Sequence, residues 1–295
     1  MIMDRRFYTL DVFTRTRFEG NPLAVITDGD GLSPAQMQAM AREFNLAETV
    51  FVQKPTDNRA LARLRIFTTQ EELKLAGHPV IGTWFLLAEL GVVPAQEGVV
   101  HVLQQTGAGV LPVEIHFHDG RPDFVRMIQK EATFRPVKVN KGALAAALGI
   151  SKSDFHTALE PQFVSTGIFN LMVPLRNRAA LAKIEANMQA LRRVLGRNGT
   201  VAYCFVLGEK DKAYARSMVP WELYEDPATG SAAGSLGAYL VRNGRLLPGK
   251  KLSLTQGVEM GRPGHIEVEV LQSGKKLVPR VSGAAVRVFQ GTIQI

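Results

Sequence analysis

Three titratable residues stand beside glycine turns or at a strand entry, where side chains are well placed to meet a substrate. Glu48 opens a strand-like run, and His78 directly follows Gly77. Asp226 precedes a turn that ends at Gly230. Carboxylates and imidazoles are the usual general acids and bases of enzymes, provided that they converge on one site. Each residue also has an ordinary structural interpretation. Glu48 would be a solvated charge at a strand start, His78 a helix cap and Asp226 a turn former.

Two predicted helices, each led by a glycine, follow two of these residues. Segments 77–91 and 230–244 are equal in length and almost free of charge until their last turn. A helix that is apolar on every side must be buried all round. The repetition predicts a duplicated domain whose helix N-termini face a common cleft for a small carboxylate. The ordinary reading is that Gly77 and Gly230 serve tight turns and that Ser231 is an N-cap.

Short strand-like runs surround both helices along the chain and predict an α+β fold. They occupy 7–13, 23–26, 49–52, 61–68, 99–104, 110–118, 124–129, 201–207, 251–255, 266–271 and 286–295. Each half is expected to form a curved, mainly antiparallel sheet or barrel around its central helix, with amphipathic helices at Gly142–Leu148 and Ala179–Leu195 outside the second half. We expect an N-terminal domain at 1–118, completed by a C-terminal strand at 280–295, and a C-terminal domain at 119–279.

Composition excludes several classes of protein. The 295 residues are 46% hydrophobic and include one cysteine, Cys204, so an intramolecular disulfide framework is excluded. The net charge of +8 comes from scattered basic pairs without interleaved aromatic residues, which argues against a nucleic-acid partner. No apolar run is long enough to span a membrane and no signal peptide opens the chain. We therefore expect a cytoplasmic protein without a membrane partner.

Motifs for metal and nucleotide binding are incomplete. His116 and His118 alternate on a strand as a metal pair would, but the pattern places no third ligand, and a solvated strand face is the better account. Gly77 to Gly82 has the spacing of a phosphate-binding loop without its lysine, and no dinucleotide-binding glycine pattern follows a strand. The sequence therefore predicts no metal, nucleotide or nicotinamide site.

Motifs along nearly the whole chain resemble those of the phenazine-biosynthesis isomerase (PhzF-like) family, in the same order. They are Asp11–Phe13, Gly20–Val25, Asn45–Thr49, Arg65–Thr68, Ala76–Pro79, Glu225–Gly234, and Gln256–Gly257 followed by Gly261–Pro263. The Asp-Pro-Ala-Thr-Gly-Ser and Ala-Gly-His-Pro runs are specific. The resemblance implies the diaminopimelate epimerase fold, with two pseudo-symmetric domains that each wrap a central helix. It also implies a homodimeric enzyme that needs no cofactor and acts on a small carboxylate.

The resemblance further implies a reaction and the residues that perform it. The family's best-known activity moves a proton along the ring of trans-2,3-dihydro-3-hydroxyanthranilate. Glu48 resembles the general acid/base that takes and returns this proton, and His78 and Asp226 resemble its polar partners. The residues that resemble the substrate-anchoring set are Gly77, Gly230 and Ser231.

Departures from the family pattern leave the substrate open. Ala47 stands where the family often has Ser, Lys74-Leu75 stands where it often has Pro-Phe, and both lie beside the expected site. Related racemases of this fold use two cysteines, which are missing here from the duplicated turns, and Cys204 is expected to be a buried structural thiol. The alternatives are an epimerase or racemase of an amino or hydroxy acid, and a non-catalytic member of the fold that binds a small anion.

Overall fold

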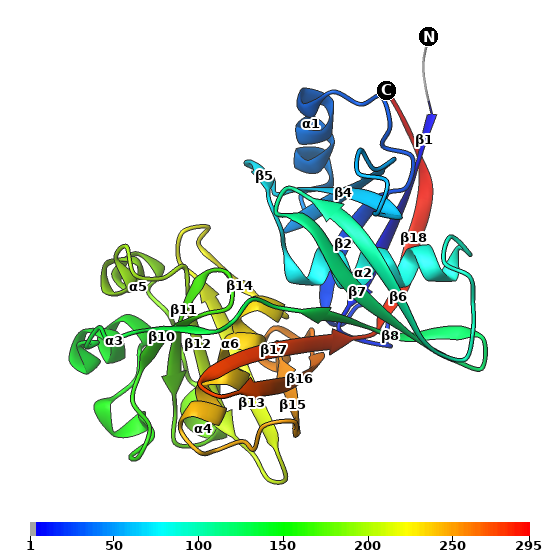
Figure 1. The fold of residues 1–295 in the computed structure, drawn as a ribbon. Coiled ribbons are helices and arrows are strands. Elements are labelled where there is room, and N and C mark those ends of the chain that lie inside the picture. Colours follow the sequence, from blue (N-terminus) through cyan, green and yellow to red (C-terminus); the bar gives the residue numbers. More distant parts are fainter. Residues whose placement is uncertain (1–3) are drawn as a thin grey trace. The chain divides into compact units, whose positions relative to one another are not determined.

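The chain, in a computed structural model that describes residues 4–295, divides into two compact units (Figure 1). Unit 1 consists of the residues up to Met127 together with Ser282–Ile295, and unit 2 is Ile128–Val281. Each unit contains a mixed, mostly antiparallel sheet and one central helix, which confirms the predicted α+β class. Among residues 4–295, no helix combines the length and apolar character that crossing a bilayer requires.

Unit 1 combines the N-terminal strands with the last strand of the chain. Its helices are α1 (Pro34–Phe44) and α2 (Gly77–Glu89), and its strands are β1 (Asp4–Val12), β2 (Asn21–Ile26), β3 (Glu48–Gln53), β4 (Ala62–Phe67), β5 (Glu72–Leu73), β6 (Gly98–Thr106), β7 (Gly109–His118), β8 (Arg121–Ile128) and β18 (Ala285–Gln294). Strands β1 and β2 pair antiparallel, β2 and β3 parallel, and β4 antiparallel with both β3 and β5. Strand β6 then pairs parallel with β4 and antiparallel with β7. Strand β18 lies antiparallel to β1, red beside blue in Figure 1.

Unit 2 repeats this order of pairings. Its strands are β9 (Thr133–Arg135), β10 (Gln162–Ser165), β11 (Phe169–Pro174), β12 (Val201–Leu207), β13 (Lys212–Val219), β14 (Tyr224–Asp226), β15 (Lys251–Gln256), β16 (Gly264–Ser273) and β17 (Lys276–Gly283). Its helices are α3 (Lys141–Leu148), α4 (Arg178–Ala182), α5 (Met188–Leu195) and α6 (Gly230–Arg242). From β10 to β16 the successive pairings are antiparallel, parallel, antiparallel, antiparallel, parallel and antiparallel, as they are from β1 to β7. The units are therefore copies of one topology.

An arginine–glutamate fork occupies the same place in both pairing patterns. Arg65 of β4 binds Glu72 of β5 through contacts of 2.8 and 2.6 Å. Arg216 of β13 binds Glu225 of β14 through contacts of 2.9 and 2.8 Å. In both units the glutamate pairs across the ladder with the residue two positions after the arginine. The forks therefore align the two units residue by residue.

Both central helices are buried on every side, as predicted. Residues 78–88 of α2 and residues 232–240 of α6 are all buried. Strands approach α2 so closely that a Cβ atom at Gly82 would lie 2.6 Å from Val12 Cγ2 and 2.7 Å from Leu23 Cδ2. Only glycine leaves room for this contact, because real Cβ atoms do not approach other heavy atoms so closely.

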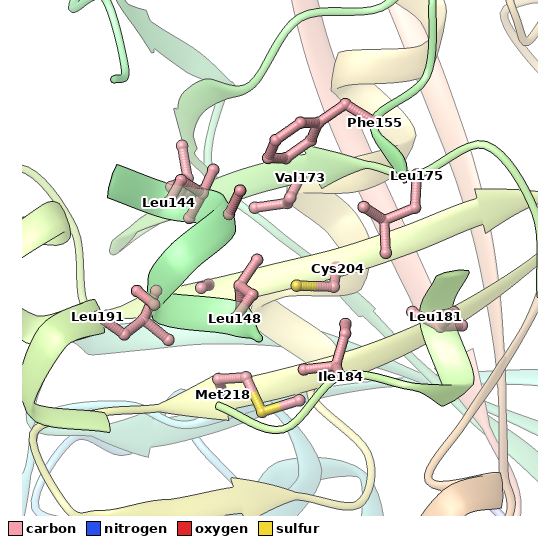
Figure 2. Packing of buried hydrophobic residues seen from close by; sticks show 14 of the residues in the cluster. Leu144, Leu148, Phe155, Val173, Leu175, Leu181, Ile184, Leu191, Cys204 and Met218 are labelled. Atoms are coloured by element: carbon pink, nitrogen blue, oxygen red, sulfur yellow. The ribbon is translucent and has the colours of Figure 1, made fainter. Parts of the chain in front are cut away.

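Short helices cover the outer face of the unit 2 sheet, the face that points away from α6. Figure 2 shows Leu144 and Leu148 of α3 and Leu191 of α5 packed over the strand that carries Cys204. Cys204 is fully buried, and burial raises the pKa of its thiol to about 12. Cys204 is therefore a protonated core residue, in agreement with the sequence.

The predicted helix over Ala179–Leu195 is wrong, because the chain forms two shorter helices there, α4 and α5. Asn187 caps α5 by accepting a hydrogen bond of 2.9 Å from the Ala190 N–H. Ile184, in the connection between them, is buried in the outer core. The Arg216 guanidinium binds the carbonyl oxygens of Leu181, Ala182 and Ile184 at the end of α4. A capping residue and a distant arginine thus divide an amphipathic pattern that reads as one helix.

Gly82→Ala is expected to lower the free energy of unfolding by about 1–3 kcal/mol, because its methyl group would overlap strand side chains in a packed core. Chemical denaturation of the full chain measures this change. Gly142→Ala is the matched control in α3, where a Cβ would first meet, at 3.1 Å, the flexible end of Lys152. Equal stability of Gly82→Ala and the wild type would contradict the close packing of α2.

Candidate active site

Glu48 and His78 form the polar centre of unit 1. Helix α1 ends at Asn45, whose left-handed backbone (φ 51°) turns the chain toward β3, and Glu48 is the first residue of that strand. His78 is the second residue of α2 and is 6% exposed. Its Nε2 lies 3.3 Å from Glu48 Oε2. A strand entry and a helix N-terminus therefore bring the predicted base and its predicted partner together.

Asn21 fixes the other side of the His78 ring. Its Nδ2 lies 3.4 Å from His78 Nδ1, and Asn21 is fully buried at the start of β2. Donation from the amide to Nδ1 leaves the ring proton on Nε2, the nitrogen that faces Glu48. The preceding Gly20 has φ +60°, and a Cβ there would lie 2.2 Å from the Val12 carbonyl oxygen. The turn that presents Asn21 therefore requires glycine.

His78 is neutral at physiological pH. Burial lowers its pKa from 6.5 to about 3, because a charged imidazole would lose its hydration. The neutral ring therefore adds no positive charge beside the Glu48 carboxylate, 3.3 Å away. A neighbouring cation would favour the ionised carboxylate and lower its basicity.

Asp226 belongs to a second set of polar residues, in unit 2. It is the last residue of β14, is 7% exposed, and pairs across the ladder with Ser217 of β13. The Thr229 hydroxyl binds Asp226 Oδ2 and lies 2.8 Å from the Ser217 hydroxyl. A hydroxyl has one proton to donate, so donation to the carboxylate makes Thr229 the acceptor from Ser217.

Gln256, at the end of β15, holds the turn between Asp226 and α6 through both atoms of its amide. Its Nε2 donates to the Asp226 carbonyl oxygen at 2.7 Å and to Thr229 Oγ1 at 3.0 Å. Its Oε1 accepts from the Thr229 N–H at 3.1 Å and from the Tyr203 hydroxyl at 2.7 Å. Burial and the charge of Asp226 raise the pKa of Tyr203 well above its usual value, so this phenol stays protonated and donates.

The first turns of α2 and α6 lack the polar caps that the ordinary interpretation of the sequence assigns to them. Their N-cap residues are Ala76 and Thr229, and neither of these described side chains accepts a hydrogen bond from its own helix. Ser231 is not an N-cap but the second residue of α6, the position that His78 has in α2. Its carbonyl oxygen accepts from the hydroxyls of Thr166 and Ser235. Two helix N-termini without side-chain caps suit the binding of an anion.

The predicted residues fall into two groups, one in each unit. Glu48, Gly77 and His78 lie together in unit 1, and Asp226, Gly230 and Ser231 lie together in unit 2. The sequence reasoning missed the residues that position them, which are Asn21, Tyr203, Ser217, Thr229 and Gln256. Asn21, Thr229 and Gln256 do stand in motifs that the family resemblance quotes, and this was the sequence signal for them.

The sequence predicted that His116 lies on a solvated strand face, and the structure differs. Its ring stacks on Phe124 with 4.0 Å between centroids, and its Nε2 lies 3.6 Å from Glu114 Oε2. His118 is exposed and lies 3.3 Å from Glu97. The pairing of β7 with β8 has a register shift between His116 and Phe117, so His116 and His118 have different neighbours. Glu97, His118 and Asp119 offer ligand atoms within 4.8 Å of one another, but all three are exposed surface residues.

Comparison with known proteins identifies relatives over the whole length of the chain. The sequence model of the family described as phenazine biosynthesis-like protein matches residues 10–291. An uncharacterized isomerase of Mesorhizobium japonicum is 34% identical over 99% of this chain and 99% of its own length. A trans-2,3-dihydro-3-hydroxyanthranilate isomerase of Pseudomonas fluorescens is 34% identical over 97% of this chain and 98% of its own length.

Solved structures agree with the fold. A phenazine biosynthesis protein of the PhzF family from Bacillus anthracis has a TM-score of 0.90 and 28% identity over 99% of this chain and 100% of its own. A probable proline racemase from Agrobacterium radiobacter has a TM-score of 0.69 and 15% identity over 98% of this chain and 92% of its own, a likeness of fold alone. The predicted epimerase-like fold is confirmed.

His78→Asn is expected to flatten the acid side of the pH–stability curve. The folded pKa of about 3 lies below the ordinary 6.5, so the unfolded chain binds this proton more readily. Stability is therefore lost as pH falls from 6.5 toward 3, at up to about 1.4 kcal/mol per pH unit. Denaturation at a series of pH values measures the slope, with exposed His101→Asn as control. An unchanged slope in His78→Asn would contradict the burial of a neutral ring.

Gln256→Leu is expected to lower the free energy of unfolding by about 2–5 kcal/mol, because it leaves buried polar groups of Tyr203, Thr229 and Asp226 without their partner. Thermal and chemical unfolding measure the loss. Gln272→Leu is the control, since Gln272 is exposed and its amide binds Gly274 nearby. Similar losses in the two variants would show that Gln256 does not organise the turn.

Proposed function

The chain belongs to the phenazine biosynthesis-like protein family and is an isomerase, and we propose that it moves a proton on a small unsaturated cyclic carboxylate with Glu48 as general acid/base. The observation that carries this proposal is the contact of 3.3 Å between the Glu48 carboxylate and the neutral imidazole of His78. The contact places a carboxylate beside a polar partner that carries no charge. That is what abstraction of a proton from carbon requires.

The reaction needs one base that takes a proton from one ring carbon and returns it to another. The carbon–hydrogen bonding electrons move into the conjugated system when Glu48 takes the proton. They form the new carbon–hydrogen bond when the protonated Glu48 gives the proton back. Substrate and product have the same atoms and the same overall oxidation state, so the proposed reaction needs no redox cofactor.

The second polar set is proposed to anchor the substrate. The Thr229 hydroxyl binds the Asp226 side chain and is in turn contacted by the Ser217 hydroxyl, and Gln256 holds the turn that follows Asp226. The first turn of α6 adds backbone N–H groups and the partly exposed Ser231, which suit a substrate carboxylate. Negative charge that develops on the ring would be stabilised by the same kind of donor.

A two-thiol racemisation has no support in this chain. Cys204 is the single cysteine, and it lies fully buried in the outer core of unit 2 with its pKa raised to about 12. A thiol with this pKa is not a base at physiological pH, because only the thiolate accepts a proton. The carboxylate Glu48 is therefore the proposed base.

The test is incubation with trans-2,3-dihydro-3-hydroxyanthranilate in deuterated water, followed by mass spectrometry and ultraviolet spectra. The wild type is expected to form product that carries deuterium from the solvent. Glu48→Gln keeps the shape of the side chain and removes its basicity, so turnover is expected to fall about a hundredfold to ten-thousandfold. Full turnover by a folded Glu48→Gln variant would overturn the role of Glu48.

The matched control is Glu43→Gln, which changes an exposed glutamate of α1 and is expected to leave turnover unchanged. A folded wild type without turnover would contradict this substrate. Deuterium exchange into other small cyclic carboxylates would then test the proton transfer by itself. A different substrate would be recognised at Ala47 and at Lys74, which is exposed beside the first turn of α2.

A further inference from the structure

A pocket of about 510 Å³ opens in the outer layer of unit 2, between α5 and the segment that leads into α3. Phe163 of β10, 1% exposed, is one of its lining residues, and five smaller apolar side chains complete the apolar surface. These are Val137, Val139, Ala143, Ala190 and Val194. Pockets of about 300–1,000 Å³ with mostly apolar walls and a few polar groups are the usual form of small-molecule sites.

Two cations also line this pocket, and no carboxylate does. Lys138 and Arg193 are both exposed, and within residues 4–295 neither side chain makes an ion pair. Two polar oxygen atoms of the lining residues are already engaged. Asn140 Oδ1 accepts from two N–H groups at the start of α3, and the Asn198 carbonyl oxygen accepts from Arg135. Apolar walls with two unpaired cations are complementary to an apolar molecule that carries a negative charge.

The pocket is separate from the Asp226 set within unit 2. Successive residues of a strand point to opposite faces of its sheet. Tyr203 of β12 binds Gln256 on the face that carries α6 and Asp226, whereas its neighbour Cys204 packs in the outer core. Phe163 belongs to the same outer core as Cys204. The sheet therefore lies between the pocket and the proposed substrate-anchoring residues.

We propose that this outer pocket is a second ligand site, which binds a small carboxylate with a compact apolar body, such as an aromatic acid. The apolar body packs against Phe163 and Val194, and the carboxylate is bound by Lys138 and Arg193. A nucleotide or polyphosphate does not match, because its several charges would meet only two cations and its polar body would face apolar walls. The inference is independent of the isomerase reaction.

The test uses naphthoate as the ligand and the full chain labelled at its alanine and valine methyl groups for NMR. Naphthoate is expected to shift the methyl signals of Ala143, Ala190 and Val194 in a saturable titration. Uncharged naphthamide and acetate, which lacks the apolar body, are each expected to bind about tenfold more weakly or worse. Equal binding of naphthamide would overturn the role of the cations.

Two variants separate this pocket from the proposed active site. Lys138→Gln/Arg193→Gln is expected to weaken naphthoate binding about tenfold, since it removes both charges. Lys250→Gln/Arg245→Gln, a matched pair of exposed cations outside the pocket lining of unit 2, is expected to leave it unchanged. Ala190→Phe, which fills the pocket, is expected to abolish the shifts, with thermal unfolding as the check on its fold. Naphthoate shifts that survive both variants, or that never reach these methyl groups, would overturn the proposal.

Discussion

The burial of α2 and α6 is the constraint on which the rest of the structure depends. A helix that is apolar all round is stable only when strands cover every side, and glycine at position 82 lets the strands approach α2 to van der Waals contact. The first turns are less enclosed than the helix interiors, since Gly77 and Ser231 are partly exposed. Polar residues therefore gather where each buried helix begins, and a strand entry or turn beside that point supplies the remaining groups.

The two units share this buried helix with its surrounding strands, but the residues near the start of the helix differ. The arginine–glutamate forks align the sequences of the two units. In this alignment, polar residues of one unit occupy positions that are apolar in the other. The equivalent positions that differ in this way are Glu48 and Val201, Ile66 and Ser217, Leu73 and Asp226, and Ala76 and Thr229. The two sets are thus different in kind, which supports the proposed division into proton transfer and anchoring.

Sequence patterns predicted what depends on local periodicity and missed what depends on distant side chains. The buried helices, most strands, the strand entry at Glu48 and the glycine turn before His78 are visible in the chain, because apolar periodicity and turn residues are local. The break inside 179–195 depends on Arg216, far away in sequence. The ring stacking of His116 and the contacts of Asn21 and Gln256 likewise depend on partners brought together by the fold. No spacing rule reports such partners.

Two carboxylates of unit 1, those of Glu72 and Glu48, differ in the charge of their neighbours. Glu72 faces the guanidinium of Arg65, which lowers the pKa of its carboxyl and fixes it as an anion that holds two strands together. Glu48 faces His78, whose burial and whose Asn21 neighbour both favour the neutral ring, because a protonated imidazole would present a second N–H to the Asn21 amide. Glu72 thus lies beside a permanent cation, whereas the ring of His78 adds no positive charge beside Glu48, which supports the proposal of Glu48 as the base.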